Sequence, residues 1–495
     1  MNLQVFNIDY LEQIIVLKRT TLETNTLKKY LLKGMCDLCY RTPFFVTLYL
    51  LHKPDKIIMK KINFILLLGM LFISTLGFSQ DTLTISKKEI WLKATDKNLQ
   101  IKIVNQDFNS AQADYRQSNS LFLPSISASH TAISTTNPLM SFGSKLNQEI
   151  LTASDFNPAL LNDPARTKNF ATKFEILQPL INVDGIYGRQ AAKAKMEAYA
   201  LQTERTKEYL ELEVNKAFME LQLGYKAVKV LEKANKTGDA NLKLIQNYFK
   251  QGILQKTDLL SVQVRVNEIE NQLQYAKSNV QNASDYLAFL LNEDNTNKVY
   301  KPIEELENVI ALESISTTLS NDRKDIQAMD KSSEAYAKML QSSKMNFLPR
   351  LNAFGSYELY DDTLFGTTAK GYLVGAQLSW SLFDGYKSVG KMEKAKAEFQ
   401  KSEIETQQYK AKSQLELNKT NRQLKDAENK VNLSKLALEQ SQEAYRIRSN
   451  RFTQGLEKTT DLLQSETQMF QKELEFLQAV FEYNFTQNYL HFLTK

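Results

Sequence analysis

Residues 251–260 read QGILQKTDLL and residues 454–463 read QGLEKTTDLL, so one motif occurs twice, 203 positions apart. The same offset relates YLAFL at residues 286–290 to YLHFL at residues 489–493. Each motif has a glycine, which commonly ends a helix, followed by residues that suit the start of another helix. A repeat at a fixed offset predicts that two halves of the chain share one supersecondary plan.

Each half is predicted to contain a helix, a β-hairpin that starts after a proline, a very long helix, a glycine turn and a shorter helix. Only 16 Gly and 9 Pro occur among the 495 residues. Between Tyr386 and Asn450, Gly390 is the single residue of either type. So few breaks predict helices far longer than the ~11–12 residues that are average in globular proteins.

Apolar residues recur every seven positions in the two long helices. The first series is Val214, Leu221, Val228, Leu242 and Phe249, interrupted at Asn235. The second series is Leu417, Leu424, Val431, Leu438, Tyr445 and Phe452. Sustained heptads predict coiled-coil packing of helix on helix. A stretch of roughly 60 residues forms a rod of ~90–100 Å, about three times the ~30 Å hydrocarbon thickness of a bilayer.

The hairpin segments show a different period, with apolar residues at every second position. The clearest series is Tyr372, Val374, Ala376, Leu378, Trp380 and Leu382. Residues 351–359 and 170–177 alternate in the same way, and residues 125–136 supply the weakest of the four strands. Alternation over this length, with aromatic residues near both ends, is typical of strands that span a membrane.

Four strands cannot close a barrel, and open strand edges are not tolerated in lipid. The chain is therefore predicted to share a barrel with copies of itself, and three copies would supply twelve strands. A soluble sheet buried against the helices remains the alternative on alternation alone. The stretch with Pro138, Pro158 and Pro164, and the turn at residues 361–363, are predicted to be exposed loops.

A secretory signal is predicted near the N-terminus. An apolar run at residues 62–78 follows Met59-Lys60-Lys61 and ends in small residues, the three-part pattern of a signal peptide. A single membrane anchor is the alternative, because ~17 apolar residues approach the ~20 needed to span. Since a signal must be N-terminal, we expect Met59 to be the true start.

The only two cysteines precede that signal. Cys36 and Cys39 have C-x-x-C spacing, which suits a redox or metal pair but also arises by coincidence. The mature chain would then contain no cysteine, which argues against a lipid anchor at its start.

The composition gives little support to catalysis. Only His130 and His491 follow the signal, so a His-dependent triad or a zinc site has few candidates. The chain has no Gly-rich phosphate loop of the G-x4-G-K-[ST] kind. Lys and Glu alternate along the chain, which predicts solvated helix faces instead of a nucleic-acid-binding face. We therefore predict a protein that is not an enzyme and has no cofactor, metal site or nucleic-acid partner.

With these features assembled, the chain resembles the TolC-like outer-membrane factor family over roughly residues 85–495. The resemblance rests on duplicated motifs in a common order: Leu123-Pro124 and Leu348-Pro349, Asp184-Gly185 and Asp384-Gly385, and Gly-x5-Asp at Gly252 and Gly455. It implies a mainly α-helical fold with a membrane β-barrel contribution, assembled as a trimeric α/β-barrel channel-tunnel. It also implies a periplasmic adaptor and an inner-membrane pump as partners, and outer-membrane lipid around the barrel.

The expected segments follow from this plan. They are 1–58 (an upstream extension excluded from the fold), 59–80 (signal peptide), 81–123 (periplasmic helix), 124–184 (first barrel hairpin), 185–291 (first long helical hairpin), 292–346 (linker and helix of the second repeat), 347–384 (second barrel hairpin) and 385–495 (second long helical hairpin).

The resemblance also implies acidic rings near the periplasmic end of the tunnel. The matching residue is Asp461, and one turn later this chain has Gln464 where family members can have a second acid. Three carboxylates at a narrow mouth would attract cations. The alternative is that Asp461 caps its helix, as the matching Asp258 could in the other half.

The two helical tips are the predicted adaptor contacts, because the end of a coiled coil projects furthest from the membrane. The residues are Gln251, Gly252, Ile253 and Leu254 at one tip, and Gln454, Gly455 and Leu456 at the other. Apolar residues beside a turn could seat a partner helix, or could simply pack the turn.

The predicted function is that of an outer-membrane channel subunit, with a long periplasmic extension, in a tripartite efflux pump or a type I secretion system. It would act as a passive conduit that opens when its tips splay. The alternative is a periplasmic coiled-coil scaffold or adaptor, which would not need four strands of membrane length.

Overall fold

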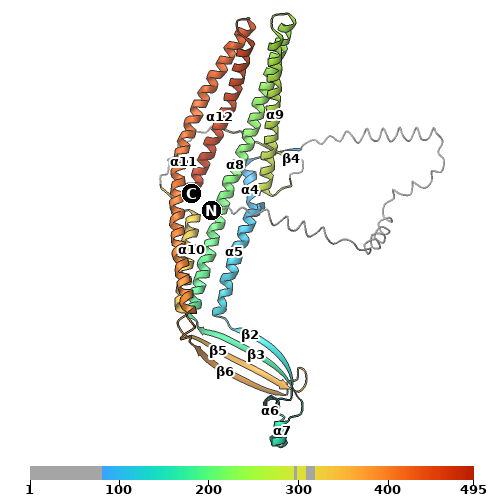
Figure 1. Cartoon of the computed structure of the whole chain (residues 1–495), viewed down its shortest axis with the longest axis vertical. Coiled ribbons are helices and arrows are strands. Elements are labelled where there is room, and N and C mark those ends of the chain that lie inside the picture. The colour runs from blue at the N-terminus through green and yellow to red at the C-terminus, as the bar shows by residue number, and fades with distance from the viewer. Residues whose placement is uncertain (1–80, 295–297, 308–317) are drawn as a thin grey trace, which may run out of the picture. The chain divides into compact units, whose positions relative to one another are not determined.

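The computed structural model describes residues 81–294, 298–307 and 318–495, which belong to one compact unit, Gln80–Lys495 (Figure 1). The expected upstream extension, the signal peptide and both cysteines lie outside the described residues. The helices are α4 (Lys87–Lys97), α5 (Leu99–Gln117), α6 (Pro138–Asn147), α7 (Pro158–Asn162), α8 (Val183–Lys250), α9 (Lys256–Leu291), α10 (Lys324–Met345), α11 (Lys387–Thr453) and α12 (Thr459–Thr494), with short 3-10 turns η2 (Ser118–Leu121) and η3 (Ala153–Phe156). The strands are β1 (Asp81–Ile85), β2 (Ser125–Thr135), β3 (Thr167–Ile181), β4 (Lys298–Pro302), β5 (Arg350–Asp361) and β6 (Ala369–Ser379).

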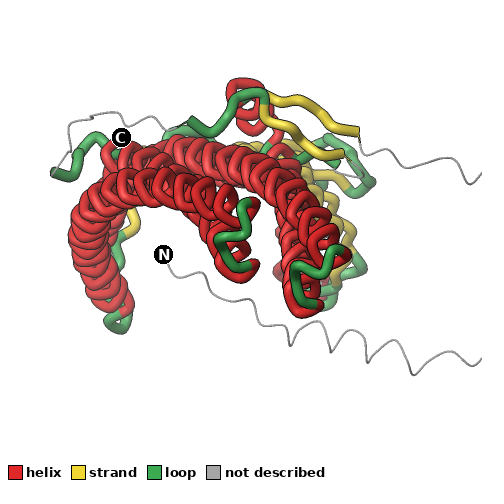
Figure 2. The backbone as a smooth tube through the Cα atoms, turned by 90° about the horizontal axis from the view of Figure 1, so that it is seen from above, coloured by secondary structure: helices red, strands yellow, loops and turns green. Residues whose placement is uncertain are grey.

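Two very long helices dominate the fold, as the scarcity of Gly and Pro predicts. The 68-residue α8 is followed by the 36-residue α9, and the 67-residue α11 by the 36-residue α12. α8 packs on α9, α11 packs on α12, and α8 also touches α12, which gives the lateral order α11, α12, α8, α9. α5 and α10 pack along α8, and α10 also packs on α11. Figure 2 looks along these helices and shows them following an arc.

The predicted heptad series points into the helical core at most positions. Val214, Leu221, Leu417, Val431 and Phe452 are buried, and the remaining members are partly buried with one exception. The exception is Phe249, which is exposed.

Towards the tip of α8 the buried seam runs instead through Ala234, Gly238, Asn241 and Ile245, spaced four, three and four residues apart. Ile245 contacts the cluster of Val262, Phe452 and Leu462, so Phe249 in the last turn falls outside it. The prediction for Phe249 is therefore wrong.

The barrel hairpins form one antiparallel sheet in the order β2-β3-β5-β6. Phe174 pairs with Tyr357, which pairs with Tyr372, so these three exposed aromatic residues share a face. The opposite face carries a charged cluster, in which Lys173 lies 3.5 Å from Glu175 and 3.6 Å from Glu358. One apolar and one polar face are what a membrane barrel strand requires.

The polar stretch between β2 and β3 differs from the predicted loop. Pro138 and Pro158 are the first residues of the short helices α6 and α7. A proline is tolerated there because the backbone N–H that it lacks would have no partner within the helix. Asn137 and Asn157 cap the two helices. Gln148 donates from Nε2 to the Lys168 carbonyl at 2.8 Å, which ties this stretch to β3. The turn after β5 is also anchored, because the buried Asp361 carboxylate accepts hydrogen bonds from the residues that follow it.

The expected single helix at residues 81–123 is interrupted twice. Its first residues form β1, which pairs in parallel with β4. The helix then breaks at Asn98, whose side chain accepts from Gln100 N at 2.9 Å and donates to the Leu290 carbonyl of α9 at 2.8 Å. A side chain that caps a second helix while binding a neighbour gives a stable break.

Among the described residues, no helix has the length and apolar character needed to cross a bilayer.

Candidate functional site

The two helical tips have the same backbone structure. Gly252 and Gly455 adopt φ values of +75° and +74°. Their amides donate to the carbonyls of Phe249 and Phe452, at 2.9 and 3.0 Å. The following amides reach back to the previous helical turn, which closes the helix end in the left-handed glycine form. The duplicated motif therefore encodes a duplicated turn.

The apolar tip residues divide between two roles. Ile253 and Leu456 are exposed, whereas Leu254 packs against the cluster around Ile245. Gln251 and Gln454 are exposed beside them. Leu254 therefore packs the turn, and Ile253 and Leu456 are the apolar side chains available to a partner.

The matching aspartates behave differently at the two tips. The Asp258 carboxylate accepts from Gln255 N at 3.1 Å and completes a capping box at the start of α9. α12 has no capping box, and its first residue follows Lys458, which makes no side-chain capping hydrogen bond. Capping thus accounts for Asp258, while the half-buried Asp461 is not engaged in the equivalent cap.

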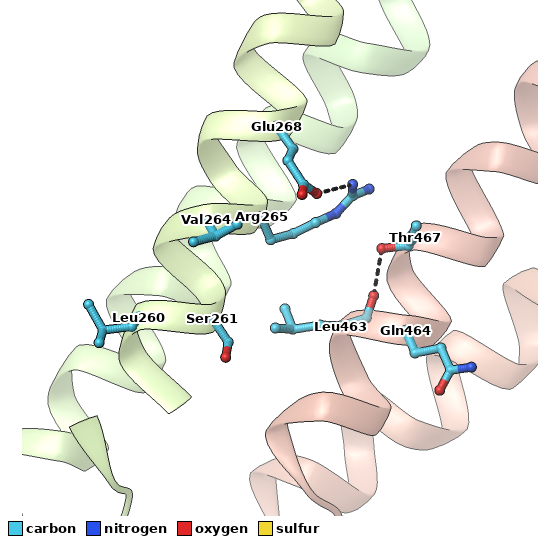
Figure 3. A pocket seen from close by; sticks show the side chains of 8 residues that line it. All are labelled: Leu260, Ser261, Val264, Arg265, Glu268, Leu463, Gln464 and Thr467. Atoms are coloured by element: carbon cyan, nitrogen blue, oxygen red, sulfur yellow. Dashed lines mark hydrogen bonds and ion pairs between the residues drawn. The ribbon is translucent and has the colours of Figure 1, made fainter. Parts of the chain in front are cut away.

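Gln464 lies beside an open depression of about 420 Å³ between α9 and α12. Figure 3 shows Arg265 extending from α9 towards α12, with Leu463 facing α9 and Gln464 turned away. The lining residues are Leu260, Ser261, Val264, Arg265, Glu268, Leu463, Gln464 and Thr467. Asp461 is not among them, so the structure does not bring the two predicted constriction residues into one cavity.

Arg265 is a member of this site that the sequence analysis missed. Its guanidinium lies 3.4 Å from Glu268, one turn along α9, and its side chain is largely buried. Its Nε is buried without a partner among the described residues. A cation held between two helices near their tips carries no periodic signature, and the contact becomes visible only when α9 and α12 are placed together.

A second missed feature lies one layer deeper. Glu466 of α12 is fully buried and accepts a hydrogen bond from Asn241 of α8, which is also buried. Tyr445 of α11 is a further hydrogen-bonding partner of Asn241. Burial raises the pKa of the Glu466 carboxyl, while the Asn241 amide and the Arg265 charge act in the opposite direction. Residues from all four long helices thus meet around one carboxyl group.

Few residues in the described ranges are candidates for catalysis or for metal binding. No group of three or more His, Cys, Asp or Glu residues there is placed to hold a metal ion. His130 sits on β2, with Nδ1 2.8 Å from the Thr172 hydroxyl, and His491 lies far along the chain in the last helix.

The chain was compared with known proteins. The model of the outer membrane efflux protein family matches residues 92–293 and 315–494, which correspond to the two halves. No curated protein sequence is significantly similar to the chain.

Several solved structures share the fold. A membrane protein from Pseudomonas aeruginosa is 16% identical with a TM-score of 0.72, over 83% of this chain and 92% of that one. The CmeC outer membrane channel of Campylobacter jejuni is 16% identical with a TM-score of 0.71, over 82% and 85%. The outer membrane protein VceC of Vibrio cholerae is 15% identical with a TM-score of 0.69, over 82% and 96%.

The structural likeness confirms the predicted fold class, with helices forming a tunnel and strands contributing to a barrel. The family match covers both halves and confirms the resemblance inferred from the duplicated motifs, which assigns the chain to an outer-membrane channel instead of a scaffold. The chain belongs to the outer membrane efflux protein family.

Proposed function

We propose that three copies of the chain assemble into a passive conduit through the outer membrane and the periplasm. The conduit would serve as the outer-membrane component of a tripartite efflux pump or a type I secretion system. One observation carries this proposal: the chain holds a sheet with an apolar face that it cannot close by itself.

The open sheet supports sharing between copies. β2 and β6 are the outer strands of the four-stranded sheet, and each has a partner on one side only. The apolar face carries the exposed Phe174, Tyr357 and Tyr372, so it suits lipid. In hydrocarbon an unpaired edge would leave several backbone groups without hydrogen bonds. Pairing β2 of one copy with β6 of the next removes both edges, and three copies give an even number of strands.

The outer helices support the same assembly. α9 and α11 are the first and last of the four side-by-side helices, and both expose apolar residues on the side away from their partners. On α11 these include Ile404, Leu415 and Leu433, which are separated by about three and five helical turns and so share one face. On α9 they include Tyr275 and Phe289, which are about four helical turns apart. A neighbouring copy would cover both stripes by placing its α9 against α11.

The tips would contact partner proteins, and the constriction residues would line the mouth of the conduit. Ile253 and Leu456 would contact a periplasmic adaptor, which links the conduit to an inner-membrane pump. Asp461, with Gln464 one turn later, would line the narrow periplasmic mouth. Energy would come from the pump, because the family is one of channels.

The experiment is to purify the chain from residue 81 in detergent, determine its oligomer mass and record single-channel currents in planar bilayers on the same sample. Trimers with discrete conductance steps would support the conduit. A monomer or dimer that is released from membranes by carbonate and gives no conductance would overturn it and favour a periplasmic scaffold.

A further inference from the structure

A second depression, of about 440 Å³, lies midway along the long helices between α8, α9 and α12. Its volume falls in the range of small-molecule sites. Much of its wall is apolar, with Leu223 and Ala227 from α8, Ala276 from α9, and Leu474 and Leu477 from α12. It therefore offers a surface that could bury the apolar part of a small molecule.

The charge at this depression is negative. Among the described residues that line it, Glu220 is the one charged residue. Burial is the main cause that raises the pKa of the Glu220 carboxyl, and Lys216 at 3.9 Å opposes the rise. Glu213, two turns before Glu220 in α8, accepts a hydrogen bond from the Tyr286 hydroxyl of the lining at 2.9 Å. The Glu213 charge also raises the pKa of Glu220, so two acidic groups act on this end of the depression and Lys216 pairs with one of them.

Aromatic rings continue along α12 beyond this depression and contact residues of α8. Phe481, Phe485, Tyr489 and Phe492 stack successively on one side of α12, with ring centroids 6.2–6.3 Å apart. The chain's own cations already use these rings: Lys216 lies over Phe485 at 5.6 Å, and the guanidinium carbon of Arg205 lies 3.6 Å from the centroid of Phe492. Such contacts stabilise a desolvated cation.

The depression faces away from the β1–β4 pair. Ser284 of α9 accepts from the backbone N–H of Tyr300 in β4, whereas Tyr286 lies two residues along and so on the opposite side of the helix. Figure 2 shows a strand pair on the outer side of the arc of long helices, which places the depression towards the inner side. In the proposed trimer, that inner side encloses the conduit.

We propose that this depression is a binding site for small organic cations with an apolar, aromatic body, which would occupy it during passage. The apolar wall would bury the body of the ligand. Its charge would lie near Glu220 and Glu213, where it competes with Lys216. The inference deepens the proposed function, and it rests on the trimeric conduit to place the site inside the tunnel.

The depression near the tips provides an internal contrast. It has a similar volume, but its one acidic residue, Glu268, is already paired with Arg265, so its lining offers no unpaired negative charge to a cation. Organic cations should therefore bind at the depression in the middle of the helices and not at the one near the tips.

The test uses two ions of the same shape and opposite charge, tetraphenylphosphonium and tetraphenylborate. Equilibrium dialysis measures their binding to the detergent-solubilised protein, and block of single-channel current measures binding in the conduit. We expect tetraphenylphosphonium to bind and to block at lower concentration than tetraphenylborate. Equal binding of both ions, or stronger binding of tetraphenylborate, overturns the inference.

Three variants locate the site. Glu220→Gln should weaken tetraphenylphosphonium binding about fivefold, the effect of losing one partly exposed ionic contact. Lys216→Gln should strengthen it, because the competing ammonium is removed. Glu232→Gln deletes the same charge from an exposed position of α8 outside the lining and should change nothing. Equal effects of Glu220→Gln and Glu232→Gln would show only a general charge effect and would overturn the site.

The two readouts separate this inference from the proposed function. A conducting trimer without selective tetraphenylphosphonium binding would support the proposed conduit and overturn the proposed binding site. A protein that does not conduct but binds tetraphenylphosphonium in a Glu220-dependent way would overturn the proposed conduit and support the proposed binding site.

Discussion

The Glu466 carboxyl of α12 accepts a hydrogen bond from the Asn241 amide of α8 at 2.5 Å, in a position with no solvent exposure. Its second oxygen, Oε1, has no partner among the described residues. The two coiled-coil pairs are therefore joined near their tips by a buried group whose charge depends on pH.

This arrangement predicts a pH-dependent contact between α8 and α12. Because burial raises the pKa of Glu466 above its ordinary 4.5, the folded state holds the proton more tightly than the unfolded state. The resulting stabilisation is complete below the unfolded pKa and is lost as pH rises through the folded pKa. Hydrogen exchange in the first turns of α12, corrected for intrinsic rates, should therefore be faster at pH 9 than at pH 5. Glu466→Gln should abolish the difference, and an unchanged difference in the variant would contradict the assignment.

Removing the Asn241 side chain should destabilise the folded protein by more than the loss of its packing contacts alone. Asn241→Ala leaves the buried Glu466 carboxyl without its donor, which costs about 1–3 kcal/mol. Chemical denaturation of the detergent-solubilised protein measures this loss. In the double variant Asn241→Ala, Glu466→Leu the cost should be smaller than the sum of the single changes, because no polar group is left unpaired. Strict additivity would show that the two side chains do not interact.

The tip glycines should resist substitution for a conformational reason. Gly252→Ala and Gly455→Ala meet no atom within 4 Å, yet both positions have positive φ. A side chain there should cost about 1 kcal/mol and loosen the tip. Gly390 in α11 is the matched control, because it too has free space but no positive φ. Gly390→Ala should be neutral or stabilising by about 0.5–1 kcal/mol. Thermal unfolding followed by circular dichroism compares the three variants.

The exposed tip residues should control export without controlling assembly. Ile253→Asp and Leu456→Asp replace the apolar contacts proposed for the adaptor with charges, and should abolish export in cells. Trimer mass and single-channel conductance of the purified variants should stay unchanged. Leu92→Asp alters a similarly exposed leucine in α4 and serves as the control. Full export by both tip variants would exclude these residues from the adaptor contact.

The two matching aspartates should separate pore lining from helix capping. Asp461→Asn should reduce cation selectivity in single-channel reversal potentials, because three carboxylates leave the mouth. Gln464→Glu should raise the selectivity by adding a ring one turn further on. Asp258→Asn should cost about 1 kcal/mol through its cap and leave selectivity unchanged. Identical selectivity in Asp461→Asn and the unmodified channel would leave Asp461 outside the pore.

Sequence periodicity predicted the parts of this fold that repeat. The heptads located the long helices, the alternation located four strands, and the 203-residue offset located both tips. The β1–β4 pair was missed because each strand has five residues and the partners lie more than 200 positions apart. The helices α6 and α7 were missed because their prolines mark a helix start as well as a loop.

The candidate site could be predicted only in part for a similar reason. A glycine turn has a local sequence signature, so the two turns at the helical tips were predicted at the correct residues. Arg265, Asn241 and Glu466 come from three helices and acquire their roles through the way these helices pack. The Glu466 carboxyl looks, in sequence, like the other helical glutamates of this chain, most of which are solvated.

The asymmetric capping of the two tips separates two tasks that one motif could perform. Asp258 caps the start of α9, whereas Asp461 forms no equivalent cap at the start of α12. Both glycines nevertheless close the preceding helix in the same way. Because the turn does not need the Asp461 carboxylate, position 461 should tolerate a wider range of residues than position 258 at little cost in folding free energy.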